Sequence, residues 1–420
     1  MKAIVLIMND IVVYWRCEDA TPRWSSLLLL VVLAICPSVA IAQKAKKTSE
    51  SLEEIDPPLA RMVVADAKGD FIELRRIRTL DTKTAVELAK STGGLGLSGL
   101  EILDAGVAAA LASCPGRLEL DGITTLDANA ASALARAKVF IRLQGLQSLT
   151  SVPLAKKLAV QGSEVSLPRI KKMDRDVADA LADCKGPLVL DGLEVLDHKG
   201  LARCLSRSEG SQCTFDSLLT LTPEAAAAFE NSSRSFHFAK LSQIDAATAA
   251  GFSGHSQGLV FVGLEQADPE ALEIIFRNKG PTCVGNLPRL APQGAAIAPA
   301  VLKAIAEHEG VLGLAGLTDI DMSLAGALKQ HRGDVHLTGV KRLDTGVAES
   351  LVGCRGILWL DGLVLGTPDG EAAVKALLKH RGGPRTGFVL NATTIHHLPE
   401  TLMESCENHV QIYIGNTVGQ

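Results

Sequence analysis

Acidic and hydroxyl residues recur along the sequence at nearly constant intervals. They are Asp81, Asp104, Asp127, Thr150, Asp174, Asp197, Thr222, Asp245, Asp268, Asp321 and Asp344. Each stands before an alanine- and leucine-rich stretch, where an Asp or Thr oxygen can accept hydrogen bonds from the free N–H groups of a helix N-terminus. Two of them, Thr222 and Asp268, are followed by Pro and Glu, which favour the first helical turn. We interpret the series as caps of successive helices and not as a catalytic set.

Other short motifs do not predict a reaction. Residues 94–99 (GLGLSG) match GxGxxG, but the match covers an expected strand, whereas a nucleotide fingerprint follows a strand and opens a helix. The tripeptide Arg332-Gly333-Asp334 falls at a repeat junction. The ten histidines lack metal-ligand spacing, and HExxH, a CxxC pair and GxSxG are all missing from the sequence. We therefore expect no catalytic residue, no metal ligand and no cofactor.

The elements that position these residues come from one repeated unit. The segment from Leu95 to Gly116 reads LGLSGLEILDAGVAAALASCPG, and the next copy begins at Leu118. Similar strand-like cores begin at Ile72, Leu95, Leu118, Ile141, Val165, Leu188, Cys213, Phe236, Leu259, Thr282, Leu312, Val335, Leu358 and Phe388. A nearly fixed period in the range of about 20–50 residues predicts a stack of short units in which each buries the apolar face of its neighbour.

Each unit predicts a strand followed by a helix. The pattern L-x-L has a period of two, so its leucines point inward and its middle residue points to solvent. A glycine turn, L-x-x-L and a cap then precede A-x-x-L-A, which gives one apolar helical face. We expect an α/β solenoid of about fourteen 23-residue strand–helix units, with a parallel sheet on one face and helices on the other. Longer connections are expected over residues 287–300 and 363–387, and a final strand over residues 410–414.

The units resemble leucine-rich repeats, in the L-x-L-x-G-L-x-x-L…A-x-x-L-A variant of exported bacterial proteins, over about residues 59–420. The resemblance implies a right-handed solenoid with a concave parallel sheet, convex helices and a role in binding other macromolecules. The chain departs from the usual pattern, because Ser98, Asp121, Gln144 or Thr338 stands where an Asn is expected. The rival fold is a parallel β-helix of similar period, against which the cap followed by A-x-x-L-A argues.

The N-terminal region predicts export. Residues 25–42 form an apolar run that ends in Ala40-Ile41-Ala42, as in a secretory signal peptide, although an uncleaved N-terminal anchor would look similar. We divide the chain into a signal peptide or anchor (1–42), a polar linker (43–58) and a repeat solenoid with terminal caps (59–420). The expected location is the periplasm, the cell surface or the medium, with membrane attachment only if the signal is uncleaved.

Charge and cysteine content narrow the partners and the covalent chemistry. The formal charge of the chain is −5, whereas nucleic-acid binding requires a basic face. We therefore expect no nucleic-acid partner. Seven cysteines follow residue 42, an odd number that cannot pair completely within an exported chain. Cys114, Cys184 and Cys354 precede closing glycines, where burial is expected, and Cys204 with Cys213 is a possible disulfide.

The exposed column of the sheet is the expected binding surface. Among the middle residues of the L-x-L triplets, the candidates are Glu119, Arg142, His237, His336, Trp359 and Tyr413. The favoured function is a non-enzymatic, protein-binding module of the cell envelope or exterior, with a protein or an extended polymer on the sheet face. The alternatives are a glycan-active enzyme on a β-helix-like stack and a self-associating structural envelope protein. The sequence leaves the oligomeric state open.

Overall fold

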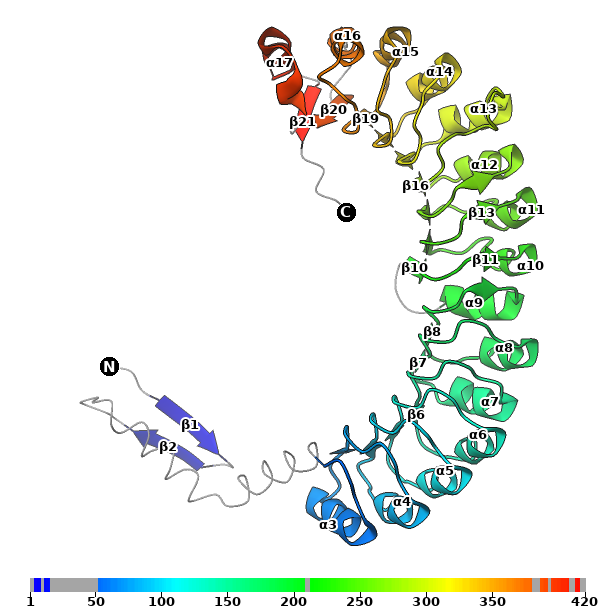
Figure 1. Cartoon of the computed structure of the whole chain (residues 1–420), viewed down its shortest axis with the longest axis vertical. Coiled ribbons are helices and arrows are strands. Elements are labelled where there is room, and N and C mark those ends of the chain that lie inside the picture. Colours follow the sequence, from blue (N-terminus) through cyan, green and yellow to red (C-terminus); the bar gives the residue numbers. More distant parts are fainter. Residues whose placement is uncertain are drawn as a thin grey trace.

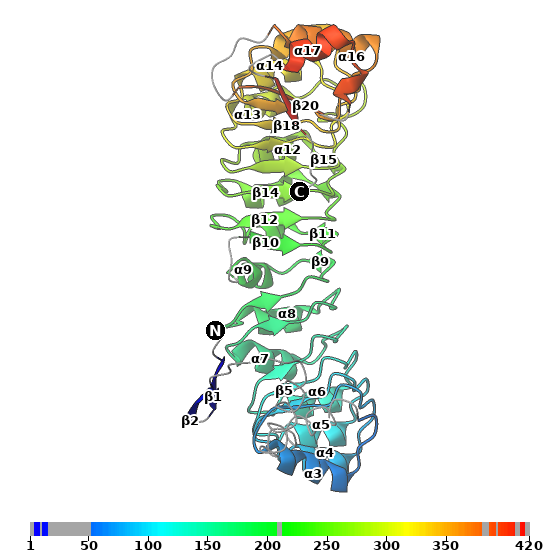
Figure 2. The same cartoon turned by 90° about the vertical axis from the view of Figure 1, so that its left-hand side faces the viewer.

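The computed structural model describes residues 4–8, 11–15, 52–207, 212–379, 386–391, 394–407 and 412–415. From α3 (Pro57–Ala67) to β21 (Ile412–Gly415) the chain forms an arc of stacked units, with strands on the concave side and helices on the convex side (Figure 1). Viewed toward the concave side, the strands lie one above another along the stack (Figure 2). The expected leucine-rich-repeat-like α/β solenoid is therefore confirmed, and the helices exclude the rival β-helix.

All fourteen predicted strand cores lie in observed strands. They are β3 (Ile72–Glu73), β4 (Leu95–Gly96), β5 (Leu118–Glu119), β6 (Ile141–Arg142), β7 (Val165–Ser166), β8 (Leu188–Val189), β10 (Gln212–Phe215), β12 (Ser235–Phe238), β14 (Leu259–Phe261), β16 (Thr282–Val284), β17 (Leu312–Gly313), β18 (Val335–His336), β19 (Ile357–Trp359) and β20 (Gly387–Asn391). Two short ladders, β9 (Val195–Leu196) with β11 (Thr220–Leu221) and β13 (Gln243–Ile244) with β15 (Gln266–Ala267), connect the segments that follow the strands.

The concave strands pair in parallel but form three sheets rather than one. Their orders are β3-β4-β5-β6, β7-β8 and β10-β12-β14-β16-β17-β18-β19-β20-β21. The ladder stops between β6 and β7 and again between β8 and β10, where the spacing between strand cores is slightly longer than in the preceding units. At the first break the Gln161 side chain replaces the next strand: the Ile141 N–H donates to Gln161 Oε1 at 3.2 Å, and Gln161 Nε2 donates to the Ile141 carbonyl at 3.1 Å.

Fifteen helices of the described chain cover the convex side. They are α3, α4 (Thr82–Leu88), α5 (Ala105–Leu111), α6 (Ala128–Leu134), α7 (Val152–Val160), α8 (Arg175–Ala182), α9 (Lys199–Arg207), α10 (Pro223–Ala226), α11 (Ala246–Ala249), α12 (Pro269–Phe276), α13 (Pro299–Glu307), α14 (Met322–Gln330), α15 (Thr345–Leu351), α16 (Pro368–Leu377) and α17 (Glu400–Glu407). Two 3₁₀ helices, η1 (Ala250–Phe252) and η2 (Ile395–His397), complete the set.

Nine of the eleven predicted caps occupy the N-cap position of a helix. Thr150 was wrong, because the hydroxyl of the next residue, Ser151, accepts from the Leu154 N–H of α7. Asp197 was also wrong: His198 Nδ1 accepts from the Leu201 N–H at 3.0 Å at the start of α9. In both cases the neighbouring side chain competes for the same free N–H groups.

The boundaries of several elements near the two ends of the solenoid differ from the prediction. Helix α3 starts at Pro57, capped by Asp56, so the two prolines assigned to the linker form its first turn, where a missing N–H costs no hydrogen bond. The longer connection predicted over residues 363–387 contains helix α16, which begins at Pro368 and is capped by Thr367. The last strand, predicted over residues 410–414, is observed over residues 412–415, and residues 410 and 411 lie outside the described part of the chain.

The N-terminal region is described only in part. Strands β1 (Ile4–Met8) and β2 (Ile11–Trp15) pair antiparallel. The apolar run 25–42 and most of the linker lie outside the described residues. Among the helices that are described, none has both the length and the apolar character needed to span a membrane.

The core is a continuous stack of leucine and alanine side chains, with phenylalanines in its middle. Phe238 is fully buried, and its ring stacks on Phe215 at 5.1 Å and 6° on one side and on Phe261 at 5.1 Å and 10° on the other. Phe229 and Phe252 pack against the same ring. The large rings lie where helices α10 and α11 have only four residues each, so they fill the core that longer helices fill elsewhere.

A buried polar column follows the C-terminal ends of the convex helices. Cys114 Sγ contacts the Ser91 carbonyl of the preceding unit. His308 Nδ1 contacts the Phe276 carbonyl at 3.1 Å, His331 Nδ1 contacts the Ile305 carbonyl at 3.2 Å, and the two imidazoles stack at 5.5 Å. Burial is the largest cause that lowers the pKa of both histidines. These side chains contact backbone carbonyl groups at or just after the C-terminal ends of the helices in the preceding units.

Candidate functional site

The predicted column exists, and its members lie in register. Arg142 lies beside Glu119, His237 beside Val260, His336 beside Trp359, and Tyr413 beside Val389. Because the two sheet breaks separate Arg142 from Ser166 and Val189 from Thr214, the six candidates do not form one surface. They divide into an N-terminal part, with Glu119 and Arg142, and a C-terminal part with the other four.

The N-terminal part of the concave side pairs its own charges. Arg142 Nε donates to Asp121 at 2.8 Å, and Arg142 Nη2 lies 2.7 Å from Glu119 Oε2. Arg117 lies 2.9 Å from Glu119 Oε1, close enough for an ion pair although the angle does not make a hydrogen bond, and its guanidinium lies 4.5 Å from the Phe71 ring centroid. The Asp121 hydrogen bond is the main cause that raises the pKa of Arg142. The four charged side chains of this network are therefore paired with one another within the chain.

The burial of Glu119 contradicts the prediction for this residue. It was predicted to be exposed, but only 3% of the residue is accessible. The flanking side chains Arg117 and Arg142 cover it from the neighbouring positions. A middle position in L-x-L therefore faces the concave side without being open to solvent when its neighbours are long and oppositely charged.

The C-terminal part of the concave side carries acids without basic partners. In each unit from β8 to β20, three positions alternate with the inward-pointing residues and face the concave side. They are the residue before the first inward-pointing residue, the middle residue of the strand, and the residue two positions after the middle one. These alternate positions hold Asp191, Asp216, Asp334 and Asp361 but no lysine or arginine. We call the positions from β10 to β20 the C-terminal concave surface.

Two acids approach each other at the N-terminal edge of this surface. Asp191 and Asp216 occupy equivalent positions in successive units, and burial followed by the negative charge of Asp216 raises the pKa of Asp191. His237 Nδ1 lies 3.9 Å from Asp216 Oδ1 and has no hydrogen-bond partner. The edge is therefore acidic and has an imidazole nitrogen with unused hydrogen-bonding capacity.

Small and apolar side chains form the centre of the surface. Val262 and Val311 are each 40% exposed, and Val260 and Cys283 are half-buried. At Gly313 an added Cβ would overlap the Cys283 sulfur, so the glycine allows the neighbouring side chain to lie flat on the sheet. The centre offers apolar contact area between two acidic ends.

An aromatic pair lies at the C-terminal end of the surface. His336 and Trp359 are paired residues of adjacent strands, and their rings stack with centroids 5.0 Å apart and planes 10° apart. Burial lowers the pKa of His336, and the negative charges of Asp334 and Asp361 oppose this shift. Both rings are half-buried and lie against each other across the two strands, and the lowered pKa keeps the imidazole uncharged at neutral pH.

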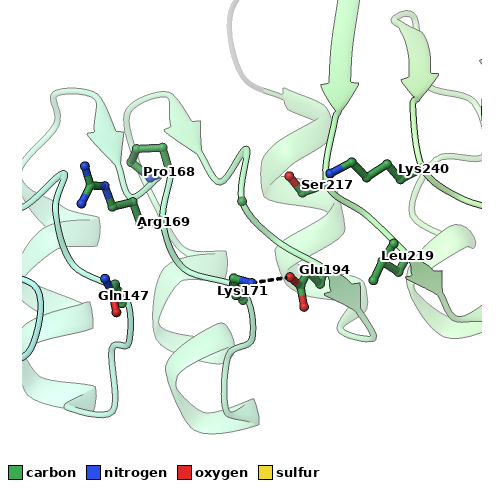
Figure 3. A pocket seen from close by; sticks show the side chains of 9 residues that line it. Gln147, Pro168, Arg169, Lys171, Glu194, Ser217, Leu219 and Lys240 are labelled. Carbon is green, nitrogen blue, oxygen red and sulfur yellow. Dashed lines mark ion pairs between the residues drawn. The ribbon is translucent and has the colours of Figure 1, made fainter.

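A separate shallow pocket lies beside the segments that follow the strands (Figure 3). Its volume is about 450 Å³. It is lined by Gln147, Pro168, Arg169, Lys171, Gly192, Glu194, Ser217, Leu219 and Lys240. Lys171 pairs with Glu194 at 2.9 Å. Asp191 and Asp216 are not among the residues that line this pocket.

The cysteines differ from the predicted pairing. Cys204 and Cys213 are both free thiols, and Cys213 Sγ contacts the Leu205 carbonyl at 3.7 Å. The thiol that interacts with Cys204 belongs to Cys184, whose pKa is lowered to about 7, chiefly by the hydrogen bond from Cys204. The described residues include no cluster of three or more histidines, cysteines or acids that could hold a metal ion.

Asp361 and the pocket were missed from the sequence. Asp361 was not among the predicted candidates, although its distance of two residues from Trp359 places it on the same face of the sheet. The pocket is built from turn residues of successive units, whose individual types carry no common signal.

The chain was compared with protein-family models, curated proteins and solved structures. The first two comparisons find no match. Among solved structures, an internalin from Listeria monocytogenes is 12% identical, over 93% of this chain and 98% of the other, with a TM-score of 0.39. A leucine-rich-repeat protein of Leptospira interrogans is 14% identical, over 89% and 98%, with a TM-score of 0.39. The yeast complex of Rad7 and Elc1 contains a chain that is 11% identical, over 96% and 99%, with a TM-score of 0.28. The fold assignment rests on the repeated units of this chain itself.

Proposed function

We propose that the chain is a non-enzymatic, protein-binding module that acts at the cell envelope or exterior and binds its partner on the C-terminal concave surface. The observation that carries this proposal is the stacked pair of His336 and Trp359, held beside acids that have no basic partner on the same surface. Half-buried aromatic side chains with apolar surroundings are the usual anchors of protein interfaces.

The contrast between the two parts of the concave side supports this location. Arg142 and Arg117 neutralise Glu119 and Asp121 within the chain, so a partner would have to break these pairs to gain new ones. The C-terminal concave surface requires no such exchange. A partner that supplies apolar and basic groups gains contacts there without replacing internal ones.

The export part of the proposal rests on the sequence of residues 25–42, which has the length and the small-residue end of a cleaved signal. A polar spacer, residues 43–56, separates this run from α3. The folded stack would therefore be released, or held on a short tether, on the far side of the membrane.

A pull-down from the native envelope tests the proposal. The exported form, residues 43–420, is immobilised as the wild type, as Trp359→Ala and as Val160→Ala. Val160 is 59% exposed at the end of α7 on the convex side, so its truncation removes exposed apolar area away from the proposed surface. Loss of an aromatic anchor costs about 2 kcal/mol or more, roughly thirtyfold in affinity. We expect the captured protein to disappear with Trp359→Ala and to remain with Val160→Ala.

Equal capture by all three forms would contradict a role for this surface. Light scattering on the purified exported form checks the self-associating alternative, since an assembly that Trp359→Ala dissociates would make the chain its own partner. Release of sugars from envelope glycans by the purified form would instead support the enzymatic alternative.

A further inference from the structure

Asp361 has an oxygen that lacks a hydrogen-bond donor. The residue is 6% exposed, and its Oδ1 is buried and has no hydrogen-bond partner. It follows Trp359 by two residues and therefore faces the same side of the sheet. Its negative charge acts on His336, the stacking partner of Trp359. A buried carboxylate oxygen without a donor lowers the stability of the free protein, and a ligand that supplies a donor removes this cost.

Asp121 shows how the same position is satisfied elsewhere. Each aspartate directly precedes the turn glycine of its unit. The carboxylate of Asp121 accepts from Arg142 Nε at 2.8 Å and from the Gln144 N–H at 3.2 Å, both in the next unit. In the unit after Asp361, the positions equivalent to Arg142 and Gln144 hold Val389 and Asn391, and the position equivalent to Asp361 in the preceding unit holds Thr338; none of the three is a cation. The basic group that completes the site in the N-terminal part is absent from these positions.

We propose that the C-terminal concave surface binds an extended basic segment of a partner protein, and that Asp361 receives an arginine or lysine side chain of that segment beside Trp359. This inference rests on the proposed function and adds the chemical class of the partner. An arginine suits the position best, because its planar guanidinium can donate to the carboxylate while its face lies against an indole.

The rest of the surface fits an extended segment. Val260, Val262 and Val311 provide apolar contacts in the middle, and Asp216 with His237 offers a second polar end. From β10 to β19 the sheet makes six steps between neighbouring strands, or on the order of 29 Å at about 4.8 Å per step. An extended chain of about nine residues covers this distance. The expected segment has a basic residue near each end and apolar residues between them.

Selection of random linear nonapeptides displayed on phage, with the exported form as bait, tests this class directly. We expect the selected peptides to be enriched in arginine and lysine, with apolar residues between the basic ones. The affinity of a selected peptide is then measured by fluorescence anisotropy for the wild type, Asp361→Asn and Asp121→Asn. The two variants make the same chemical change at the same place in the repeat, but Asp121 already has a basic partner. Asp361→Asn should weaken binding at least tenfold, and Asp121→Asn by less than twofold.

Folding of each variant is checked by circular dichroism and by its urea midpoint. If Asp361→Asn does not fold, the salt dependence of peptide binding by the wild type serves as the test instead. The affinity should fall at least threefold between 50 and 500 mM NaCl, because salt screens a contact between a cation and a carboxylate. Peptides without basic enrichment, salt-independent binding, or a folded Asp361→Asn of unchanged affinity would overturn the inference.

The outcomes also separate this inference from the proposed function. If Trp359→Ala abolishes capture of an envelope protein while Asp361→Asn does not, the surface binds a protein but the basic anchor is wrong. If the exported form is a dimer that Asp361→Asn converts to a monomer, the occupant is a second copy of the chain, and a separate partner segment is refuted.

Discussion

Phe238 connects the two halves of the core, and its replacement by alanine should separate their unfolding. The residue is fully buried and stacks between Phe215 and Phe261. Loss of a buried phenylalanine costs about 3–5 kcal/mol, and each well-stacked ring pair contributes about 0.5–1.5 kcal/mol. With two parallel stacks, Phe238→Ala belongs at the upper end, about 5 kcal/mol.

The position of Phe238 determines how this loss is expressed. Units of a solenoid contact only their neighbours, so a weakened central interface uncouples the units on its two sides. The exported form has a single tryptophan, Trp359, which reports on the C-terminal part, whereas circular dichroism reports on every helix. In urea, the two signals should change together for the wild type and at different concentrations for Phe238→Ala.

Phe276→Ala is the matched control. Phe276 is also fully buried but lies outside the ring cluster, so its replacement should cost about 3 kcal/mol. The reasoning fails if the two variants lose the same stability, or if circular dichroism and fluorescence of Phe238→Ala still report one common transition.

Perturbed ionisation makes two further effects measurable. Burial lowers the pKa of His308 and His331 below 6.5. As the pH falls, these histidines are therefore protonated in the unfolded chain before they are protonated in the folded one. The stability that the neutral histidines contribute above pH 6.5 is lost as the pH falls toward their pKa in the folded chain. The urea midpoint should therefore be lower at pH 5 than at pH 7.5, and less so for His331→Gln. The Cys184 thiol, with a pKa of about 7, should be the fastest of the seven to react with iodoacetamide at pH 7. Cys204→Ala removes its hydrogen-bond donor and should slow this reaction about tenfold; an unchanged rate at Cys184, measured by peptide mass spectrometry, would refute the assigned donor.

The fold could be predicted because one pattern specifies it fourteen times. Strand positions follow from L-x-L, since alternation leaves only one face that can be buried. Helix starts were less certain at Thr150 and Asp197, because Ser151 and His198 are equally able to cap and lie one residue away. The sheet breaks coincide with slightly longer intervals between strand cores, which are visible in the sequence. At the first break the Gln161 side chain bonds to Ile141 in place of the next strand, and a period alone cannot place that side chain.

The candidate surface was predictable as a column but not as a set of free or paired charges. Pairing depends on contacts between units, such as Arg142 with Glu119 and Asp121, and these require the register between strands. The burial of Glu119 has the same origin. Asp361 could have been found by extending the two-residue alternation one step beyond each strand, but its lack of a donor is visible only when both adjacent units are in place.

The amide of Gln161 has a consequence for solubility. A strand that ends a sheet normally exposes N–H and C=O groups, which invite strands of other molecules and lead to aggregation. At Ile141 both groups are already bonded to a side chain of the same chain. The N–H and C=O groups of Ile141 are therefore not available to a strand of another molecule, although the sheet is interrupted at this place.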